Sequence, residues 1–250
     1  MNNQPLIIAN WKMKLGLAES RSLAMAVKNL AAKKAEIVLC PSFTSLAEVG
    51  KVIKGSGLKL GSQDCFWESA GAFTGEISVR QIKEVGCEYV ILGHSERRTH
   101  LGETDEMIHR KAGAVLAADL TPVVCVGETF EQRQEGATDY VLIQQVTKAL
   151  AGAALLAGQT LVVAYEPVWV IGSGQAIEPA AAAAAHEVIR QTLLDLFGAE
   201  TVKRQLRVIY GGSVDAGNVG AFVRQENTHG ILVGGASLNA ETFSEIIKNA

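Results

Sequence analysis

One pattern occurs eight times along the chain: a short apolar run rich in β-branched residues, followed by a stretch with helical spacing of apolar side chains. The runs lie at residues 6–9, 37–40, 58–60, 89–93, 122–126, 161–165, 206–210 and 230–233. Near-continuous apolar runs are typical of strands buried on both faces of a parallel sheet. Eight such units in 250 residues, with no linker between them, predict a closed (β/α)8 barrel that forms a single domain over residues 1–250.

An open, doubly wound sheet is the alternative arrangement of repeated βα units. Such a sheet usually carries a nucleotide fingerprint, and neither G-x-G-x-x-G nor G-x-x-x-x-G-K-[ST] occurs in this chain. The closed barrel is therefore favoured. Its helices are expected at about 18–33, 46–53, 79–85, 104–118, 140–156, 179–197 and 218–223, with a last one ending near residue 248.

The net charge and the spacing of the cysteines argue against several classes of function. The formal net charge of −3 gives no basic surface for nucleic acid or an acidic membrane. The four cysteines form no C-x-x-C pair, so neither a zinc site nor a redox pair is indicated, and free thiols suit a reducing cytosol. With no signal-peptide pattern at the start and no apolar run of membrane-spanning length, a cytoplasmic protein is expected.

Polar and small residues follow the predicted strands at their carboxyl ends. They are Asn10, Lys12, His94, Glu166, Ser213, Gly234 and Gly235. In a (β/α)8 barrel these ends converge on one face, where catalytic groups lie. No single one of them identifies a site, because a lysine at such a position is more often a solvated cation and a glycine there also simply makes a tight turn.

Glu166 stands at the end of the sixth run, directly before Pro167. The next residues are the bulky apolar 168–170 and then Gly172-Ser173-Gly174, a loop able to fold down and exclude water. An acid beneath such a lid is typical of proton transfer, although a surface glutamate before an ordinary loop has the same local pattern.

His94 directly follows the fourth run and precedes Ser95-Glu96, a possible helix start. A helix N-terminus disfavours a positively charged imidazole, and a neutral ring can donate a hydrogen bond to a developing oxyanion. The other four histidines are expected to be surface or packing residues: His100, His109, His186 and His229. The pairs Gly211-Gly212 and Gly234-Gly235 follow the last two strands, where barrels often bind phosphate through backbone N–H groups.

Seven motifs, in order over essentially the whole chain, together resemble those of the triosephosphate isomerase family. They are ANWKM at 9–13, GAFTGE at 71–76, GHSERR at 93–98, CVGE at 125–128, YEPVW at 165–169, YGGSV at 210–214 and VGGAS at 233–237. The resemblance implies interconversion of dihydroxyacetone phosphate and glyceraldehyde 3-phosphate through an enediol(ate), without cofactor or metal. The departures from the family pattern, at Lys14, in the lid and its exit (170–177) and at Glu178, touch no reacting group.

The same resemblance implies a role for each site residue. Glu166 is the base, His94 the electrophile and Lys12 a fixed cation. Asn10 orients the substrate. The phosphate is bound through backbone N–H groups of Gly172, Ser213, Gly234 and Gly235.

A long segment, Cys65–Ile77, carries Phe66, Trp67 and Phe73 and is expected to expose them. Loops of this length are often functional, and exposed aromatic side chains indicate a partner surface. By resemblance it is the arm of a homodimer that inserts Thr74 beside Asn10 and Lys12 of the partner subunit.

Two other functions remain open. A phosphate-binding barrel aldolase would use Lys12 as a Schiff-base nucleophile, a chemistry that favours a lysine in an apolar pocket. A sugar-phosphate sensor would keep the barrel without turnover, although such a protein has no need of a base, an electrophile, a cation and a lid.

Overall fold

The computed structural model describes residues 4–30, 35–171 and 175–250. The lid residues Gly172, Ser173 and Gly174 lie outside the described residues, as do residues 31–33 at the end of the helix expected from 18 to 33.

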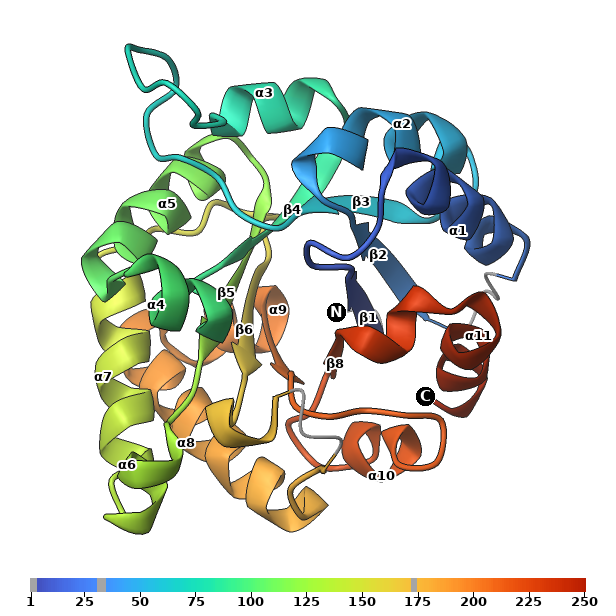
Figure 1. The fold of residues 1–250 in the computed structure, drawn as a ribbon. Coiled ribbons are helices and arrows are strands. Elements are labelled where there is room, and N and C mark those ends of the chain that lie inside the picture. The colour runs from blue at the N-terminus through green and yellow to red at the C-terminus, as the bar shows by residue number, and fades with distance from the viewer. Residues whose placement is uncertain (1–3, 31–34, 172–174) are drawn as a thin grey trace.

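Eight parallel strands close into a barrel in the order of the sequence, which confirms the predicted (β/α)8 fold (Figure 1). The strands are β1 (Leu6–Asn10), β2 (Glu36–Cys40), β3 (Lys59–Ser62), β4 (Cys87–Leu92), β5 (Thr121–Val126), β6 (Leu161–Tyr165), β7 (Leu206–Tyr210) and β8 (Gly230–Val233). Because every strand runs the same way, the residue that follows each strand lies at the same end of the barrel.

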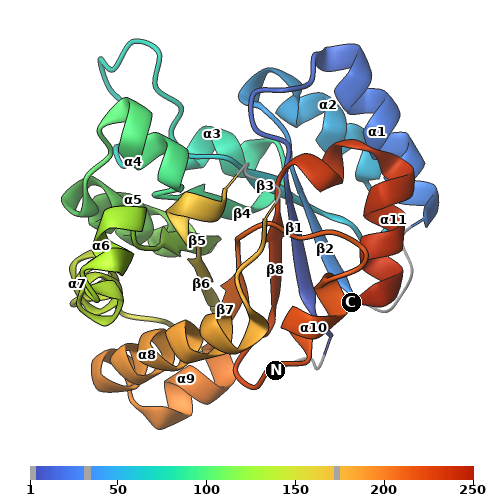
Figure 2. The same cartoon turned by 60° about the horizontal axis from the view of Figure 1, so that its bottom comes forward.

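Helices surround the strands on the outside, as the two views show (Figures 1 and 2). They are α1 (Leu17–Leu30), α2 (Phe43–Ile53), α3 (Val79–Glu84), α4 (Ser95–Leu101), α5 (Asp105–Ala117), α6 (Phe130–Gln134), α7 (Thr138–Leu150), α8 (Pro179–Phe197), α9 (Ala199–Gln205), α10 (Val219–Val223) and α11 (Ala240–Asn249). Two short 3₁₀ helices, η1 (Val168–Val170) and η2 (Gly235–Leu238), follow β6 and β8.

Alternate strand residues build two apolar layers. Leu6 and Ile8 of β1 belong to the cluster inside the barrel, while Ile7 and Ala9 belong to the larger cluster between the strands and the helices. Burial of a leucine or isoleucine side chain contributes about 1.5–3 kcal/mol. Both layers therefore hold the strand ends, and the side chains that follow them, in fixed positions.

Local capping explains where the helices differ from the sequence prediction. The helix expected over 140–156 ends at Leu150, because Gly152 takes a left-handed conformation (φ 76°) just beyond it. The short helix α6 was not predicted. It begins with a capping box in which Thr129 accepts from the Gln132 N–H and the Gln132 side chain accepts from the Thr129 N–H.

Candidate active site

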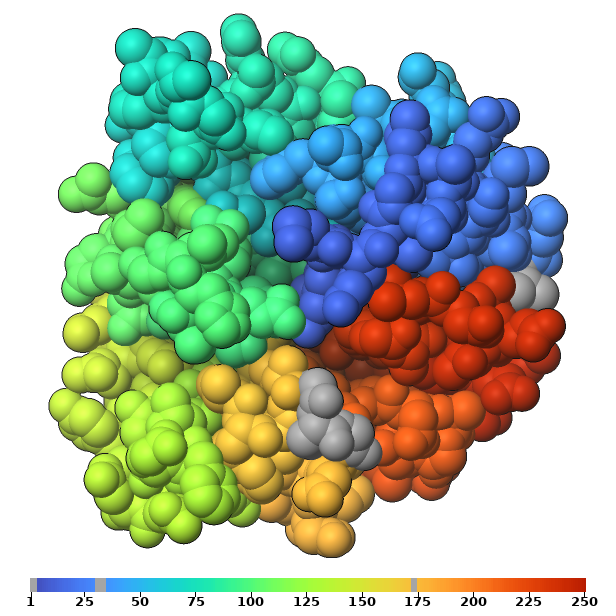
Figure 3. All heavy atoms as spheres, viewed as in Figure 1, coloured from blue at the N-terminus to red at the C-terminus, as the bar shows by residue number. Residues whose placement is uncertain are grey.

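A cavity of about 350 Å³ opens at the carboxyl ends of the strands. It is lined by six of the predicted residues together with seven others: Asn10, Lys12, His94, Ser213, Gly234 and Gly235, with Ile171, Gly211, Gly212, Val214, Asp215, Leu232 and Ala236. Figure 3 shows a recess near the centre of this face, where the N-terminal (dark blue), green and C-terminal (red) segments meet. The barrel thus brings these predicted positions, which are far apart in the sequence, to a common wall.

The end of β1 fixes Lys12 in an unusual conformation. Lys12 has a positive φ of 53°, which is uncommon for a residue other than glycine. Its N–H donates to Asn10 Oδ1 at 3.0 Å, and its carbonyl accepts from the Gln63 side chain at 2.9 Å. These bonds hold the backbone so that the ammonium reaches across to Glu96 Oε1, 2.6 Å away.

Glu96 was not singled out by the sequence, but it is the charge partner of Lys12. Burial alone would raise the pKa of Glu96, yet the hydrogen bond and the positive charge from Lys12 bring this pKa below its ordinary value. The carboxylate therefore stays ionised and keeps the Lys12 ammonium at the cavity. A paired ammonium does not fit the apolar environment that a Schiff-base lysine needs.

His94 follows β4 and is the residue that caps α4. Its Nδ1 accepts a hydrogen bond from the Glu96 N–H at 3.2 Å, so Nδ1 carries no proton. In a neutral ring the proton is then on Nε2, which lies 3.4 Å from Glu166 Oε1. The helix start expected at Ser95 is present, and it fixes which nitrogen of His94 faces the carboxylate.

Glu166 is only 1% exposed. Oε2 accepts from the backbone N–H of Ser95 at 3.0 Å, whereas Oε1 accepts no hydrogen bond within the described part of the chain. Burial, and then the negative charge of Glu166, raises the pKa of the neighbouring Cys125 thiol well above its usual value. The carboxylate thus has one oxygen anchored and one available to accept a proton.

Two arginines hold the short helix α4 in place. Arg97 bonds Asp64 at 2.8 Å and Glu103 at 2.9 Å. Arg98 bonds Asp105 at 2.6 Å and the Gly93 carbonyl at 2.8 Å. Because His94 caps this helix and Ser95 begins it, these ion pairs also fix the contacts of both residues with Glu166.

Glycines make up the turns that follow β7 and β8 and line the cavity. A Cβ on Gly212 would lie 2.1 Å from the Tyr210 hydroxyl, and a Cβ on Gly234 would lie 3.2 Å from Lys12 Cε. A Cβ on Gly235 would meet nothing within 4 Å. Close packing therefore accounts for Gly212. At Gly234 an added Cβ would press on the end of the Lys12 side chain, and Gly235 is left unexplained.

The root of the predicted lid packs on Glu128, which the sequence analysis gave no role. The Trp169 indole Nε1–H donates to Glu128 Oε1 at 3.1 Å, and the Tyr165 hydroxyl donates to the same carboxylate. The Arg133 guanidinium lies over the Trp169 ring, 4.9 Å from its centroid. Ile171 lines the cavity, while the predicted tip residue Gly172 lies outside the described residues.

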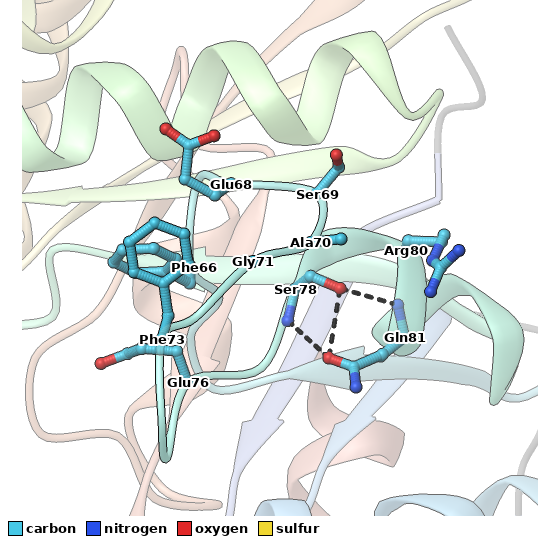
Figure 4. Close-up of a pocket in the computed structure, with 10 residues that line it drawn as sticks. All are labelled: Phe66, Glu68, Ser69, Ala70, Gly71, Phe73, Glu76, Ser78, Arg80 and Gln81. Carbon is cyan, nitrogen blue, oxygen red and sulfur yellow. Dashed lines mark hydrogen bonds between the residues drawn. The ribbon is translucent and has the colours of Figure 1, made fainter.

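The segment Cys65–Ile77 projects from the barrel beside α3 (Figures 1 and 2). A second cavity of about 230 Å³ lies against it, and Figure 4 shows Ser78 and Gln81 at its edge, joined as the capping box of α3. The expectation that all three aromatic side chains are exposed is wrong. Phe66 packs on Trp67 with ring centroids 4.2 Å apart, both are half-buried, and Phe73 alone is exposed.

Across residues 4–30, 35–171 and 175–250, no group of three or more His, Cys, Asp or Glu side chains is placed to hold a metal ion. No helix within those ranges combines the length and the apolar character needed to cross a membrane. The four cysteines are free and buried.

Comparisons with known proteins agree with this geometry. A family model described as "Triosephosphate isomerase" matches residues 5–250. Proteins named triosephosphate isomerase from Endomicrobium trichonymphae and Caldanaerobacter subterraneus are 45% and 44% identical to this chain, each over 98% of both chains. One of the same name from Pelobacter propionicus is 45% identical over 97% of both chains. The chain belongs to the triosephosphate isomerase family.

Proposed function

We propose that Glu166, His94, Lys12 and Asn10 carry out the isomerisation at the cavity described above. As a member of its family, the chain is an aldose–ketose isomerase that interconverts dihydroxyacetone phosphate and glyceraldehyde 3-phosphate in glycolysis. The observation that carries the assignment is the approach of Glu166 Oε1 to His94 Nε2, 3.4 Å apart. His94 lines the cavity together with Lys12, and Glu166 lies buried behind it.

The assigned groups account for each proton. Glu166 Oε1 removes a proton from the carbon beside the carbonyl, and the electron pair moves onto the carbonyl oxygen to give an enediolate. The Nε2–H of neutral His94 donates to that oxygen, and the Lys12 ammonium stabilises the developing negative charge. His94 then exchanges protons between the two oxygens. The protonated Glu166 returns its proton to the neighbouring carbon and is restored as a carboxylate.

The phosphate of the substrate is assigned to the part of the cavity that the turns after β7 and β8 form. Backbone N–H groups of Ser213, Gly234 and Gly235 are the proposed donors there, with the Gly172 N–H added from the lid. Glycine-rich turns after the last two strands of a barrel are a common phosphate site. The unexplained Gly235 supports this role, since close approach of a phosphate to the backbone also requires the absence of a side chain.

A homodimer formed through Cys65–Ile77 is part of the proposal. Thr74 lies at the exposed part of this segment, Phe73 is 44% exposed and Met13, next to the catalytic lysine, is 93% exposed. Large apolar side chains that are exposed to solvent favour burial against a partner. Residues 1–250 are proposed to act as one domain. A cytoplasmic location is also proposed, because four free thiols suit a reducing compartment.

The test is a coupled assay in which the purified chain receives glyceraldehyde 3-phosphate and a dehydrogenase consumes the dihydroxyacetone phosphate formed. Turnover that requires only the two proteins and the dehydrogenase's nicotinamide is expected. A folded protein that binds phosphate ligands without turnover would instead support a sensor. Borohydride trapping of a substrate adduct on Lys12 would instead support an aldolase that forms a Schiff base.

A further inference from the structure

Gly127, the residue after β5, lies directly against the backbone of Glu166. The Glu166 N–H donates to the Val126 carbonyl at 2.7 Å, so the pairing of β5 with β6 continues to the catalytic residue itself. A Cβ built on Gly127 would lie 1.7 Å from the Glu166 carbonyl oxygen. No side chain therefore fits between them, and the position of the Gly127 backbone determines the position of the Glu166 backbone.

A single side chain from the outer helix layer holds Gly127. The amide oxygen of Gln145, on α7, accepts from the Gly127 N–H at 2.8 Å. The amide nitrogen of Gln145 donates to the Gly127 carbonyl at 3.2 Å. Gly127 is buried, so both of its backbone polar groups depend on this one residue for their hydrogen bonds.

Only one oxygen of the Glu166 carboxylate is held by a hydrogen bond from a backbone N–H in the described residues. Its Oε2 has the Ser95 N–H, and its Oε1 is without a hydrogen bond in the described part of the structure. The placement of Oε1 therefore depends on the position of the Glu166 backbone together with the side chains packed around it. A misplacement of about 1 Å at a reacting group can cost roughly a hundredfold in rate.

We infer that Gln145 is a positioning residue for the isomerisation, acting through the Gly127 peptide on the placement of Glu166. This inference rests on the proposed role of Glu166 as the base. Gln145 touches neither the cavity nor the predicted phosphate wall, so its contribution falls on the proton-transfer step rather than on binding.

The test compares Gln145→Leu with Gln144→Leu, a matched control one residue earlier on α7. Among the residues that the structure describes, the Gln144 side chain donates to the exposed Tyr140 hydroxyl, at 3.2 Å, and to no other group. We expect kcat to fall roughly ten- to hundredfold in Gln145→Leu, with KM within about threefold of the parent, and no change in Gln144→Leu. Gln145→Glu keeps the acceptor for the Gly127 N–H and loses the donor to its carbonyl, so its kcat should lie between the parent and Gln145→Leu.

A second substrate separates base positioning from an effect on the lid or on phosphate binding, and rates expressed per folded molecule account for any loss of fold. D-Glyceraldehyde lacks the phosphate, yet it needs the same proton removal. Its turnover by Gln145→Leu should therefore fall by the same factor as that of glyceraldehyde 3-phosphate. A parental kcat per folded molecule in both Gln145 variants, or a loss confined to the phosphorylated substrate, would overturn the inference. An inactive parent would instead overturn the proposed function.

Discussion

His94 Nε2 lies 3.4 Å from Glu166 Oε1, and the other ring nitrogen, Nδ1, accepts from the Glu96 N–H. The two side chains come from β4 and β6, which are not neighbours in the barrel. Their approach brings a group able to donate a proton and a group able to accept one within 3.4 Å of each other, beside the cavity that His94 lines. A substrate with adjacent carbonyl and hydroxyl carbons can engage both groups at once, which is the arrangement that proton transfer between neighbouring carbons needs.

Gly211→Ala tests how closely Glu166 must be held. A Cβ at this position would lie 2.8 Å from Glu166 Cγ and 3.3 Å from the Tyr165 carbonyl oxygen. We expect the carboxylate to shift and kcat to fall about a hundredfold, with the protein still folded. Steady-state kinetics and circular dichroism measure the two effects.

The control for this change is Gly113→Ala on α5, where the added Cβ meets nothing within 4 Å. Alanine within a helix should raise stability by about 0.5–1 kcal/mol and leave kcat unchanged. If Gly211→Ala retained the parental kcat, the carboxylate would not need the position seen in this structure.

Thr74→Arg tests the proposed dimer. An added cation at the exposed part of the arm would have to be desolvated at the interface, which is costly for an unpaired charge. We expect monomers of low activity by sedimentation velocity and by assay at the same protein concentration. Gln191→Arg, at an exposed position on α8, should sediment and turn over like the parent. Fully active monomers of Thr74→Arg would show that activity does not depend on a dimer formed through Cys65–Ile77.

His186 should make stability depend on pH. Its ring is buried, with Nδ1 2.7 Å from the Thr228 hydroxyl, and burial followed by the nearby His229 lowers its pKa from 6.5 to about 3. In the unfolded chain the ring takes up a proton near pH 6.5. Between about pH 3 and 6.5 the unfolded state thus binds more protons, so the free energy of unfolding falls as the pH drops through this window.

His186→Gln should remove this contribution, which has a slope of up to about 1.4 kcal/mol per pH unit. Urea unfolding at several pH values and one protein concentration gives the comparison, with exposed His100→Gln as the control. Equal slopes for the parent and His186→Gln would show that His186 does not titrate on unfolding.

The sequence predicts the barrel well because its strands are apolar runs rich in β-branched residues, a pattern that depends only on nearby residues. It also predicts the residues that follow those strands, since the fold brings strand ends together. Glu96, Glu128 and Gln145 could not be found this way. Each of them contacts a partner that lies far along the chain. Lys12 and Glu96, for example, are 84 positions apart. Local sequence patterns do not indicate such pairs. Helix α4 is also held by the ion pair of Arg97 with Asp64, which lies 33 positions earlier in the chain.

The assignment of Glu166 as the base is tested most directly by Glu166→Gln. The amide keeps the size of the side chain and an oxygen to accept from the Ser95 N–H, but it cannot take up the substrate proton. We expect kcat to fall at least ~100-fold, while a phosphate-bearing substrate analogue binds nearly as well as to the parent and the fold is kept. A kcat close to that of the parent in the purified variant would contradict the account and require another base.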